Sequence, residues 1–392
     1  MSKNAFDVVT IGGGLMGCST AYHLLKTDPT LKVAIIEMDP NYEKASTSLS
    51  DGNIRVQFNI KENVQMSLYG LEVLENFSEE MSLNNEMVDI AFHQQGNLFL
   101  QNMESQQEAI EGLSLQQSLG GKVEWLSPAQ IKQCYPLCDP KDIVGATFGY
   151  QDGSMDPWAV LIAYKNKAIE LGSDYVHSQV IEVIKSNNQV KGVKLITGEE
   201  IHAPIVLNSA GAWGAIIAKS AGIDLPMEPI KRHVFVIETN SYHEGKLPAI
   251  FFPSGLYIIH ESQGKFMIGK SFANDPIGFD FKFNKNIFTD RIWPELVEYI
   301  PSFDRLKVVG GWAGLYAVNT MDGNAILGEW PDLKGLYLSN GFSGHGFQQC
   351  HAVGRYITEL ILNSPISLDL SLFSPRRIIE NDPVFESKRK LI

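Results

Sequence analysis

Cysteine is scarce in this chain of 392 residues. There are four cysteines, of which Cys134 and Cys138 are close in sequence, while Cys18 and Cys350 lie far from them and from each other. Secreted domains that depend on disulfides are much richer in cysteine, and the Cys134–Cys138 spacing has no second pair that would complete a zinc site. The sequence therefore predicts neither a disulfide scaffold nor a metal centre.

Long apolar runs and positive charge are also lacking. No stretch of about eighteen consecutive apolar residues could cross a membrane, and no cationic and apolar leader precedes the first expected strand. Lysine and arginine total 32 against 45 aspartates and glutamates, which gives a formal net charge of -13. Nucleic-acid binding needs basic patches, and only the tail at 388–390 is dense in cations. We expect no membrane span, no nucleic-acid partner and a cytoplasmic location.

What the chain does have is length, apolar residues and glycine. Hydrophobic residues make up 44% of the sequence and glycine occurs 34 times. A chain of this size can bury a large core, and it exceeds the usual length of a single small domain. The composition predicts a large globular protein of two or three domains, or one interleaved unit.

Glycine is concentrated directly after the first apolar run, at residues 7–11. The order is strand, G-x-G-x-x-G, helix, in which Gly12 allows the tight turn and Gly14 lets a pyrophosphate approach the backbone. Gly17 lets the helix pack closely on the strand, and the helix N-terminus offers amides to phosphate. A second expected strand, at residues 32–36, continues the pattern.

That second strand ends in Glu37, about twenty residues after the glycine motif, where a carboxylate accepts hydrogen bonds from a ribose hydroxyl. The combination predicts a dinucleotide site, and the acid disfavours the 2'-phosphate of NADP. An NAD-linked dehydrogenase would need only this motif, and it remains an alternative at this point.

Later segments also contribute to the prediction. Residues 45–55 are rich in small hydroxyl residues, which could bind diphosphate or ribityl oxygens or form an ordinary solvated loop. Residues 175–184 and 189–195 read as two strands joined by a turn, and 204–213 reads as an apolar strand that ends in small residues. Chain distant from the first glycine motif is therefore expected to return to its sheet.

Six motifs, in order along the chain, resemble those of the D-amino-acid oxidase and sarcosine oxidase superfamily of flavoproteins. The resemblance is strongest to the FAD-dependent oxidoreductase domain-containing proteins, and it extends to β-type subunits of bacterial amine dehydrogenases. The motifs are VVTIGGGLMG with Glu37, ASTSLSDGNIR at 45–55, QDGSMDP at 151–157, VLNSAGAW at 206–213, GWAGLYAVNTMDGNAILG at 311–328 and GFSGHGFQQCHAVGR at 341–355.

The resemblance implies a mixed α/β fold with two domains. A Rossmann-like FAD-binding domain of the glutathione-reductase type would be discontinuous, and a substrate domain would be built on a mixed or antiparallel sheet. The FAD domain would comprise residues 1–85, 145–220 and 322–392, and the substrate domain residues 86–144 and 221–321.

It also implies which residues contact FAD. The turn that leads into a helix near His345 would place bare glycine amides and a helix dipole at the flavin edge, where reduction adds negative charge. Related oxidases carry covalent flavin on a cysteine that aligns with Gly314, so non-covalent FAD is expected unless Cys350 or a histidine substitutes. The implied contacts are Gly12, Gly14, Leu15, Met16, Gly17, Glu37, Ser46, Thr47, Ser48, Val180, Ala210, Gly211, Trp213, Gly314, Gly344, His345, Gly346, Phe347 and Gln348.

The implied reaction is the oxidation of a C–N bond in a secondary or tertiary amine or an N-alkyl amino acid. A hydride moves to flavin N5 and the imine is then hydrolysed, so the protein supplies binding, orientation and electrostatics. Arg55 could stabilise reduced flavin or pair with a carboxylate, or it could form a surface ion pair. Tyr257 and Tyr316 would line the amine cavity or be core aromatics. His345 and Gln348 complete the implied catalytic set.

Some positions depart from the sarcosine oxidase pattern. A lysine that binds the substrate carboxylate is replaced by Gln348, and a second arginine by Phe58. The oxygen-activating lysine aligns near Met267, with Lys265 and Lys270 on either side. These departures favour a dehydrogenase over a fast oxidase, with O2 or another redox carrier as the electron acceptor.

Two further expectations complete the interpretation. Lys231, Arg232 and His233 could edge the cavity or form a solvated strand end, and the second alternative is favoured. A flavin-bearing assembly or interaction factor, similar to the flavoprotein associated with respiratory complex I assembly, remains an alternative function, and a partner subunit remains possible.

Overall fold

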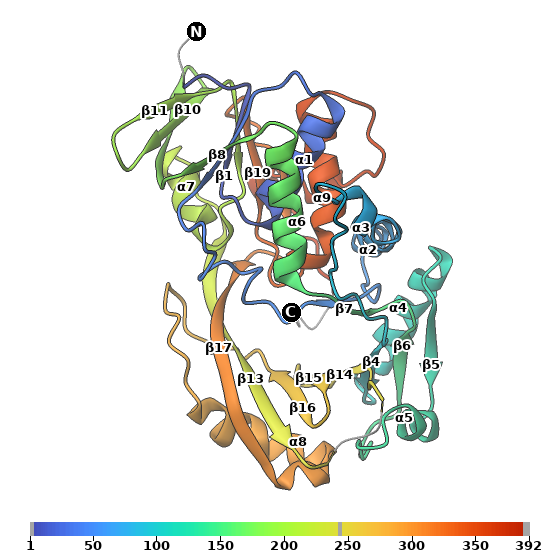
Figure 1. Ribbon diagram of the computed structural model, residues 1–392. Helices are drawn as coiled ribbons and strands as arrows, with labels where there is room; N and C mark the ends of the chain where they lie inside the picture. The colour runs from blue at the N-terminus through green and yellow to red at the C-terminus, as the bar shows by residue number, and fades with distance from the viewer. Residues whose placement is uncertain (1–3, 242–244, 387–392) are drawn as a thin grey trace.

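A six-stranded sheet forms the centre of the upper half of the molecule in Figure 1, a computed structural model that describes residues 4–241 and 245–386. The strand order is β18-β19-β12-β1-β2-β8, and all neighbours are parallel except the pair β18 and β19. Successive residues such as Val8 and Val9 pack into different clusters on opposite faces, as expected for a sheet covered on both sides. The strands are β1 (Val8–Ile11), β2 (Val33–Glu37), β8 (Asp174–His177), β12 (Ile205–Asn208), β18 (Ile326–Glu329) and β19 (Leu336–Asn340).

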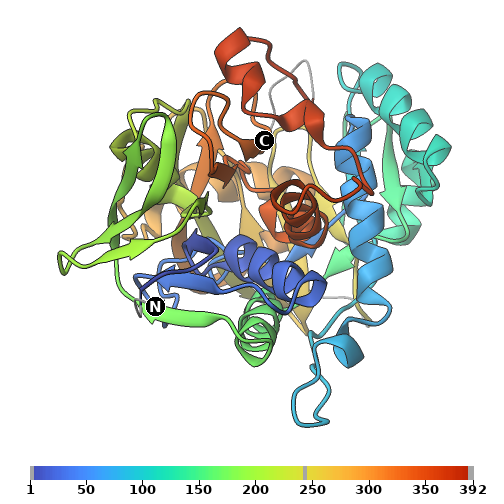
Figure 2. The same cartoon turned by 90° about the horizontal axis from the view of Figure 1, so that it is seen from above.

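Helices cover one face of this sheet. Helix α1 packs against α6 and α9, and α2 packs against α9, so that the four helices form one layer (Figure 2). The N-terminus of α6 is capped by Asp156, whose carboxylate accepts hydrogen bonds from two backbone amides of the first turn. The helices on this side are α1 (Leu15–Thr27), α2 (Lys61–Leu74), α3 (Phe77–Glu80), α6 (Pro157–Glu170) and α9 (Gly346–Ile361). The short helix α10 (Arg376–Glu380) follows near the end of the described chain.

A three-stranded antiparallel sheet and helix α7 (Gly214–Ser220) cover the other face. The prediction of a single strand over 175–184 is wrong, because the structure has two strands there, in different sheets. His177 is the last residue of β8 paired with β2, and the chain then turns away to begin the meander. The meander strands are β9 (Val180–Ser186), β10 (Gln189–Leu195) and β11 (Glu200–His202).

The lower half is built on an eight-stranded mixed sheet, ordered β17-β13-β16-β15-β14-β4-β6-β5, which confirms the expected fold class. Leu98 and Leu100 pack into the core on one face, while Phe99 between them faces the other side. Helix α4 (Gln106–Ser118) packs against β5 and β6. The core side of the sheet is covered by α5 (Pro128–Cys134), η2 (Phe288–Ile292), α8 (Trp293–Tyr299) and η3 (Pro301–Asp304). The strands are β4 (Asn97–Gln101), β5 (Val123–Leu126), β6 (Gly145–Gly149), β13 (Met227–Thr239), β14 (Ala249–Phe251), β15 (Tyr257–Ser262), β16 (Lys265–Gly269) and β17 (Leu306–Asn319).

The long strands β13 and β17 run from the lower half toward the upper one (Figure 1). They pair antiparallel from Met227 opposite Asn319 to Thr239 opposite Leu306. The exact segment boundaries of the two domains remain a prediction, although the strands of each sheet come from several separate parts of the chain. The remaining short elements are β3 (Asn53–Ile54), which pairs with β7 (Gly153–Ser154), and the turns η1 (Gly211–Trp213) and η4 (Ser371–Phe373).

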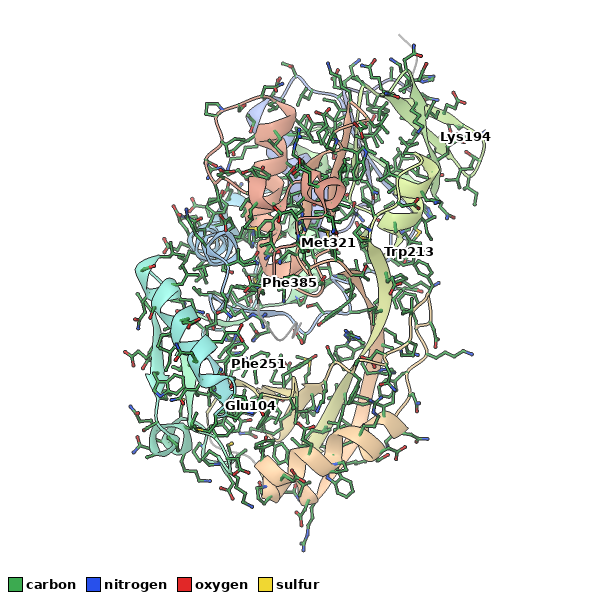
Figure 3. All side chains as sticks on the ribbon, turned by 180° about the vertical axis from the view of Figure 1, so that it is seen from behind. Glu104, Lys194, Trp213, Phe251, Met321 and Phe385 are labelled. Atoms are coloured by element: carbon green, nitrogen blue, oxygen red, sulfur yellow. The ribbon has the colours of Figure 1, made fainter. Side chains whose placement is uncertain are left out.

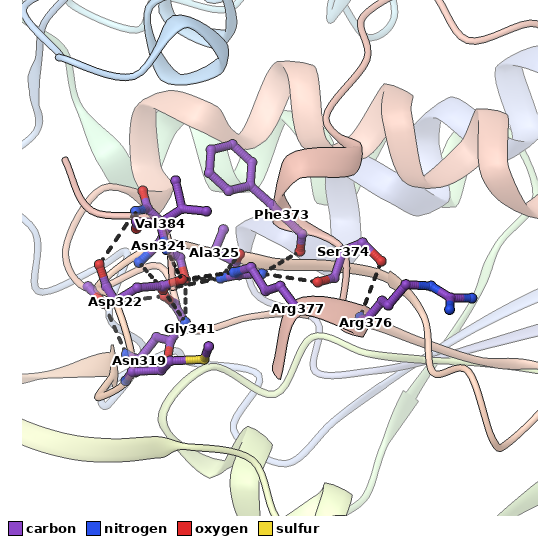
Figure 4. Close-up of polar contacts among 12 residues, drawn as sticks. Asn319, Asp322, Asn324, Ala325, Gly341, Phe373, Ser374, Arg376, Arg377 and Val384 are labelled. Atoms are coloured by element: carbon purple, nitrogen blue, oxygen red, sulfur yellow. Dashed lines mark hydrogen bonds and ion pairs between the residues drawn. The ribbon is translucent and has the colours of Figure 1, made fainter. Parts of the chain in front are cut away.

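A buried ion pair fixes the last part of the described chain (Figure 4). The guanidinium of Arg377 donates through Nε to Asp322 Oδ2 at 2.8 Å, and the same group also donates to the carbonyl of Ala325. The backbone amide of Val384 donates to the same aspartate at 3.2 Å. Removing one partner of such a pair typically costs about 3–5 kcal/mol, so this cluster anchors residues 376–386 on the sheet.

In the described ranges, no helix combines the length and the apolar character that crossing a bilayer requires.

Candidate active site

The larger of two adjoining cavities, of about 390 Å³, opens at the carboxyl ends of β1 and β2, and we call it the cofactor cavity. This is where ligands bind in open α/β sheets, and it is where the sequence predicted a dinucleotide. The predicted FAD contacts that line it are Gly12, Gly14, Leu15, Met16, Glu37, Ser46, Thr47, Val180, Ala210, Gly211, Trp213, Gly314, Gly344, His345, Gly346, Phe347 and Gln348.

Two of the predicted contacts do not line it. Gly17 lies behind the wall, where a Cβ would come within 2.0 Å of the Gly12 carbonyl oxygen, so this glycine serves the close packing of helix on strand. Ser48 is turned away, and its hydroxyl oxygen has no hydrogen-bond partner among the described residues.

The backbone around β1 is shaped as a cradle. Gly12 has φ +94°, and a Cβ there would lie 2.7 Å from the carbonyl oxygen of Ser209. A Cβ at Gly14 would meet no atom within 4 Å, since this residue faces the cavity. A pyrophosphate can therefore approach the chain at Gly14, and the cradle fits a dinucleotide.

Glu37 is in the position expected for ribose binding. Its side chain is 8% exposed, Oε2 accepts from the Gly13 amide at 2.7 Å, and Oε1 accepts from the Asp39 amide at 2.8 Å. Burial raises the pKa of Glu37, and these amide hydrogen bonds oppose that shift. Each carboxylate oxygen retains a lone pair that can accept from a ribose hydroxyl.

Helix α9 begins at Gly346, close to the predicted position, and no side chain in the described part of the chain caps its N-terminus. The preceding Gly344 has φ +97°, and a Cβ there would lie 2.4 Å from the ring of Tyr316. Only glycine fits at this point. The first-turn amides of α9 have no partners within the helix, and this end of the helix lines the cavity.

The second cavity, of about 280 Å³, continues from the first toward the eight-stranded sheet, and we call it the substrate chamber. Figure 3 labels one lining residue of each cavity, Trp213 for the cofactor cavity and Phe251 for the substrate chamber. We call the residues common to both linings the junction: Asp51, Asn53, Tyr257, Tyr316, Gly344, His345 and Gln348.

Arg55 lines the substrate chamber beside the junction. Its Nη2 lies 3.2 Å from His345 Nε2, and its backbone amide donates to Gln348 Oε1 at 2.6 Å. Its Nε has no hydrogen-bond partner in the described chain, and the guanidinium lies 4.7 Å from the ring centroid of Phe58. This is a guanidinium inside the protein rather than the surface ion pair considered from the sequence.

The imidazole of His345 is neutral at neutral pH. Burial, and to a lesser degree the charge of Arg55, lower the pKa of His345 to about 3. Since a guanidinium can only donate, Nε2 accepts from Arg55, and the ring proton is therefore on Nδ1. His345 can orient Arg55 but is a weak proton acceptor.

Both predicted tyrosines reach the junction, Tyr257 from β15 and Tyr316 from β17. Burial and the charge of Asp51 raise the pKa of Tyr316 to about 12 and raise that of Tyr257 further. Both phenols stay protonated at neutral pH and can donate hydrogen bonds into the cavities.

Of the two alternatives left open for residues 231–233, the favoured one, a solvated strand end, is wrong. Lys231 is 4% exposed and pairs with Asp280 at 2.8 Å. Arg232 lines the cofactor cavity and pairs with Asp275 at 2.7 Å. These residues lie in the middle of β13, whose length was not evident from the sequence, and the loop that follows β16 supplies the acidic partners.

Asp51 and Asn53 are the junction residues that were not predicted as site residues, and Asp51 is the ionisable one. It stands within the small-residue run that was assigned to cofactor binding, four positions before Arg55. An ionisable side chain in a run of small residues was the available signal.

The cysteine and the two lysines that the sequence singled out are not among the described residues that line either cavity. Cys350 is 0% exposed in the helix layer, and neither Lys265 nor Lys270 lines a cavity. Lys270 instead forms an ion pair with Glu295. Within the described residues, no group of histidine, cysteine and acidic side chains could hold a metal ion.

Comparison with known proteins agrees with this geometry. Residues 7–360 match the DAO family model, described as FAD dependent oxidoreductase. The chain is 34% identical to FAD-dependent oxidoreductase domain-containing protein 1 of Xenopus laevis, over 97% of this chain and 84% of that protein. It is 26% identical to the sarcosine oxidase subunit beta of an Arthrobacter species, over 94% of this chain and 91% of that protein.

A solved structure extends the similarity to the fold. L-proline dehydrogenase from P. horikoshii superposes with a TM-score of 0.86 and 27% identity, over 97% of this chain and 100% of that one. The match of the family model over most of the sequence, together with the cradle at Gly12 and Gly14, identifies the chain as a member of the DAO family of FAD-dependent oxidoreductases.

Proposed function

We propose that the protein oxidises the C–N bond of a secondary or tertiary amine or an N-alkyl amino acid. The observation that carries the proposal is the junction, where a cavity fitted to a dinucleotide meets a chamber lined by Arg55, Tyr257 and Tyr316. FAD supplies the hydride acceptor, so the chain need only bind and orient the amine and balance charge.

The roles of the chamber residues follow from their charges. Arg55 Nε has no hydrogen-bond partner among the residues that the structure describes, so the guanidinium can bind a substrate carboxylate or stabilise negative charge beside it. The aromatic wall of Phe99 and Phe251, whose rings stack with centroids 4.3 Å apart, suits the apolar part of an amine. The phenols of Tyr257 and Tyr316 stay protonated; Tyr257 donates to Asp51, and Tyr316 offers a donor to the substrate.

We further propose that FAD is held non-covalently. Gly314 lines the cofactor cavity without a side chain that could form a bond, and Cys350 lines neither cavity. His345 reaches the junction, but its Nε2 is engaged by Arg55. Acid precipitation of the purified protein should therefore release the flavin into the supernatant.

The first test is the visible spectrum of the purified protein, recorded anaerobically before and after separate additions of sarcosine, N,N-dimethylglycine, proline, glycine and D-alanine. Flavin bands near about 370 and 450 nm that bleach with one compound would support the proposal and define the substrate class. Flavin bands that no amine bleaches would contradict it and would favour an assembly or interaction role. A colourless protein that binds NAD would favour a nicotinamide enzyme.

The same sample also tests which molecule accepts the electrons from the reduced flavin. We propose a carrier other than O2, because no lysine is among the described residues that line the substrate chamber. Reoxidation of the bleached protein by air within milliseconds would contradict this part of the proposal.

A further inference from the structure

Asp51 is the single carboxylate among the junction residues. Glu37 lies at the far end of the cofactor cavity, on β2, and Glu108 lines the substrate chamber from α4. In the proposed function the amine would meet the flavin at the junction, so Asp51 would lie near the reacting nitrogen.

The loop that carries Asp51 is held in place by two hydrogen bonds to one neighbouring strand. Ser46 donates through its hydroxyl to the Leu315 carbonyl at 2.8 Å, and Trp312 donates through Nε1 to the Leu49 carbonyl at 2.8 Å. Leu315 and Trp312 both belong to β17, the long strand of the substrate half. Asp51 is therefore anchored by the elements that form the chamber wall.

The charged and titratable groups that face Asp51 come from three elements. Tyr257 and Glu261 lie on β15, Tyr316 lies on β17, and Arg55 follows β3. Burial raises the pKa of Asp51, while hydrogen bonds from the Asn53 amide and Tyr257, and the charge of Arg55, oppose the shift. The Asn53 amide lies 3.2 Å from Asp51 Oδ1.

An amine must lose a proton before its C–N bond can be oxidised. An alkylammonium has a pKa near that of lysine, so roughly one molecule in a thousand is neutral at pH 7. Hydride loss from the adjacent carbon needs the nitrogen lone pair, which the extra N–H bond occupies. A group in the chamber that takes this proton would make the common form of the substrate reactive.

We propose that Asp51 binds the substrate ammonium and accepts its proton. The O–H bond forms on the Asp51 carboxylate as the substrate N–H bond breaks, and the electron pair of that bond remains on nitrogen. The charges of the carboxylate and the ammonium cancel in the step, and Tyr257 holds the carboxylate in place. This inference rests on the proposed function, because it assigns the proton acceptor of the same reaction.

The kinetic test is the pH profile of anaerobic flavin bleaching by the amine that reduces the wild-type protein. Asp51→Asn should slow bleaching at pH 7 by about 1,000-fold, since only roughly one amine molecule in a thousand is then neutral, and this lies within the range for loss of a general base. The deficit should shrink by nearly tenfold per pH unit toward pH 10, because the free amine then needs no base. Tyr257→Phe should move the acidic limb of the profile to higher pH, since it removes a hydrogen bond that lowers the pKa of Asp51.

The matched control is Glu261→Gln, which removes a carboxylate from the same neighbourhood but does not line either cavity. It should leave the bleaching rate at pH 7 unchanged. An Asp51→Asn protein that bleaches as fast as wild type, or whose deficit is the same at every pH, would overturn the proposal. A deficit explained by tenfold weaker FAD binding would assign Asp51 to the cofactor instead.

A binding test does not depend on turnover. Glycine betaine carries a fixed positive charge and no N–H bond, and acetate carries the carboxylate alone. By calorimetry on the FAD-loaded protein, Asp51→Asn should weaken betaine at least tenfold and leave acetate unchanged. Equal betaine affinity in both proteins would overturn the role of Asp51. Failure of every amine to bleach the wild type would instead overturn the proposed function, whatever betaine does.

Discussion

The cofactor cavity and the substrate chamber adjoin each other but are built in different ways. The cofactor cavity is shaped largely by backbone, with Gly12, Gly14 and Gly344 at points where a side chain would clash or close the space. The substrate chamber is shaped by side chains such as Arg55 and Phe251, which come from distant strands and loops. Backbone sites leave a local sequence pattern, whereas side-chain sites depend on which strands become neighbours.

If this distinction holds, the largest effect should come from adding one methyl group to the cofactor cradle. Gly12→Ala forces an L-residue to φ +94° and places Cβ 2.7 Å from the Ser209 carbonyl oxygen. We expect FAD affinity to fall by roughly 100-fold, which corresponds to about 2.7 kcal/mol, in the range of backbone strain. Titration of the FAD-free protein with FAD, followed by fluorescence, measures this affinity.

The matched control for this change is Gly120→Ala. Gly120 has nearly the same dihedral, φ +97°, but a Cβ there would meet no atom within 4 Å. Both variants carry the conformational strain, and only the first disturbs the turn that meets the cofactor. Equal FAD affinity in the two variants would show that the cradle is not the binding site.

The substrate chamber should respond to a side-chain change without loss of cofactor. Arg55→Ala removes a guanidinium that lines the chamber but not the cofactor cavity. We expect flavin bleaching by the substrate to slow by roughly tenfold or more, the effect of losing one electrostatic stabiliser, while FAD content is unchanged. Stopped-flow absorbance at the flavin band, with the flavin to protein ratio recorded, separates the two.

Arg305→Ala is the control for the loss of positive charge, because the Arg305 side chain is 92% exposed. If Arg55→Ala lost FAD as readily as Gly12→Ala, the two cavities would have to be regarded as one site. An unchanged bleaching rate would remove Arg55 from the reaction.

The same distinction explains what the sequence could predict. The first strand and the glycine motif are contiguous, and Glu37 follows at a fixed distance. The sequence pattern was therefore enough to predict β1, α1, β2 and the cofactor cavity. Arg55 and Tyr316 were found through the resemblance to a family rather than through spacing. The favoured placement of Arg232 at a solvated strand end was wrong because its environment is set by the pairing of β13 with β16 and β17, which no local pattern reveals.

Asp152 lies behind the chamber wall, and it should affect stability rather than function. It is 0% exposed, its Oδ1 accepts from the Val56 amide at 2.7 Å, and its Oδ2 accepts from Gln57 Nε2 at 2.7 Å. Burial raises the pKa of Asp152 to about 7, despite these hydrogen bonds and the charge of Arg55. The folded protein therefore holds a proton at this site between about pH 4 and pH 7 that the unfolded chain releases.

Because the folded state binds more protons in that window, this carboxyl lowers the free energy of unfolding as the pH rises, by at most about 1.4 kcal/mol per pH unit. Asp152→Asn removes the titration, so its stability relative to wild type should rise from pH 4 to pH 7 and then level off. Urea unfolding at pH 5, 6, 7 and 8 measures the difference, with the exposed Asp174→Asn as control. A flat difference would mean that Asp152 is charged throughout, and a change in FAD affinity would mean that the chamber wall also supports the cofactor cavity.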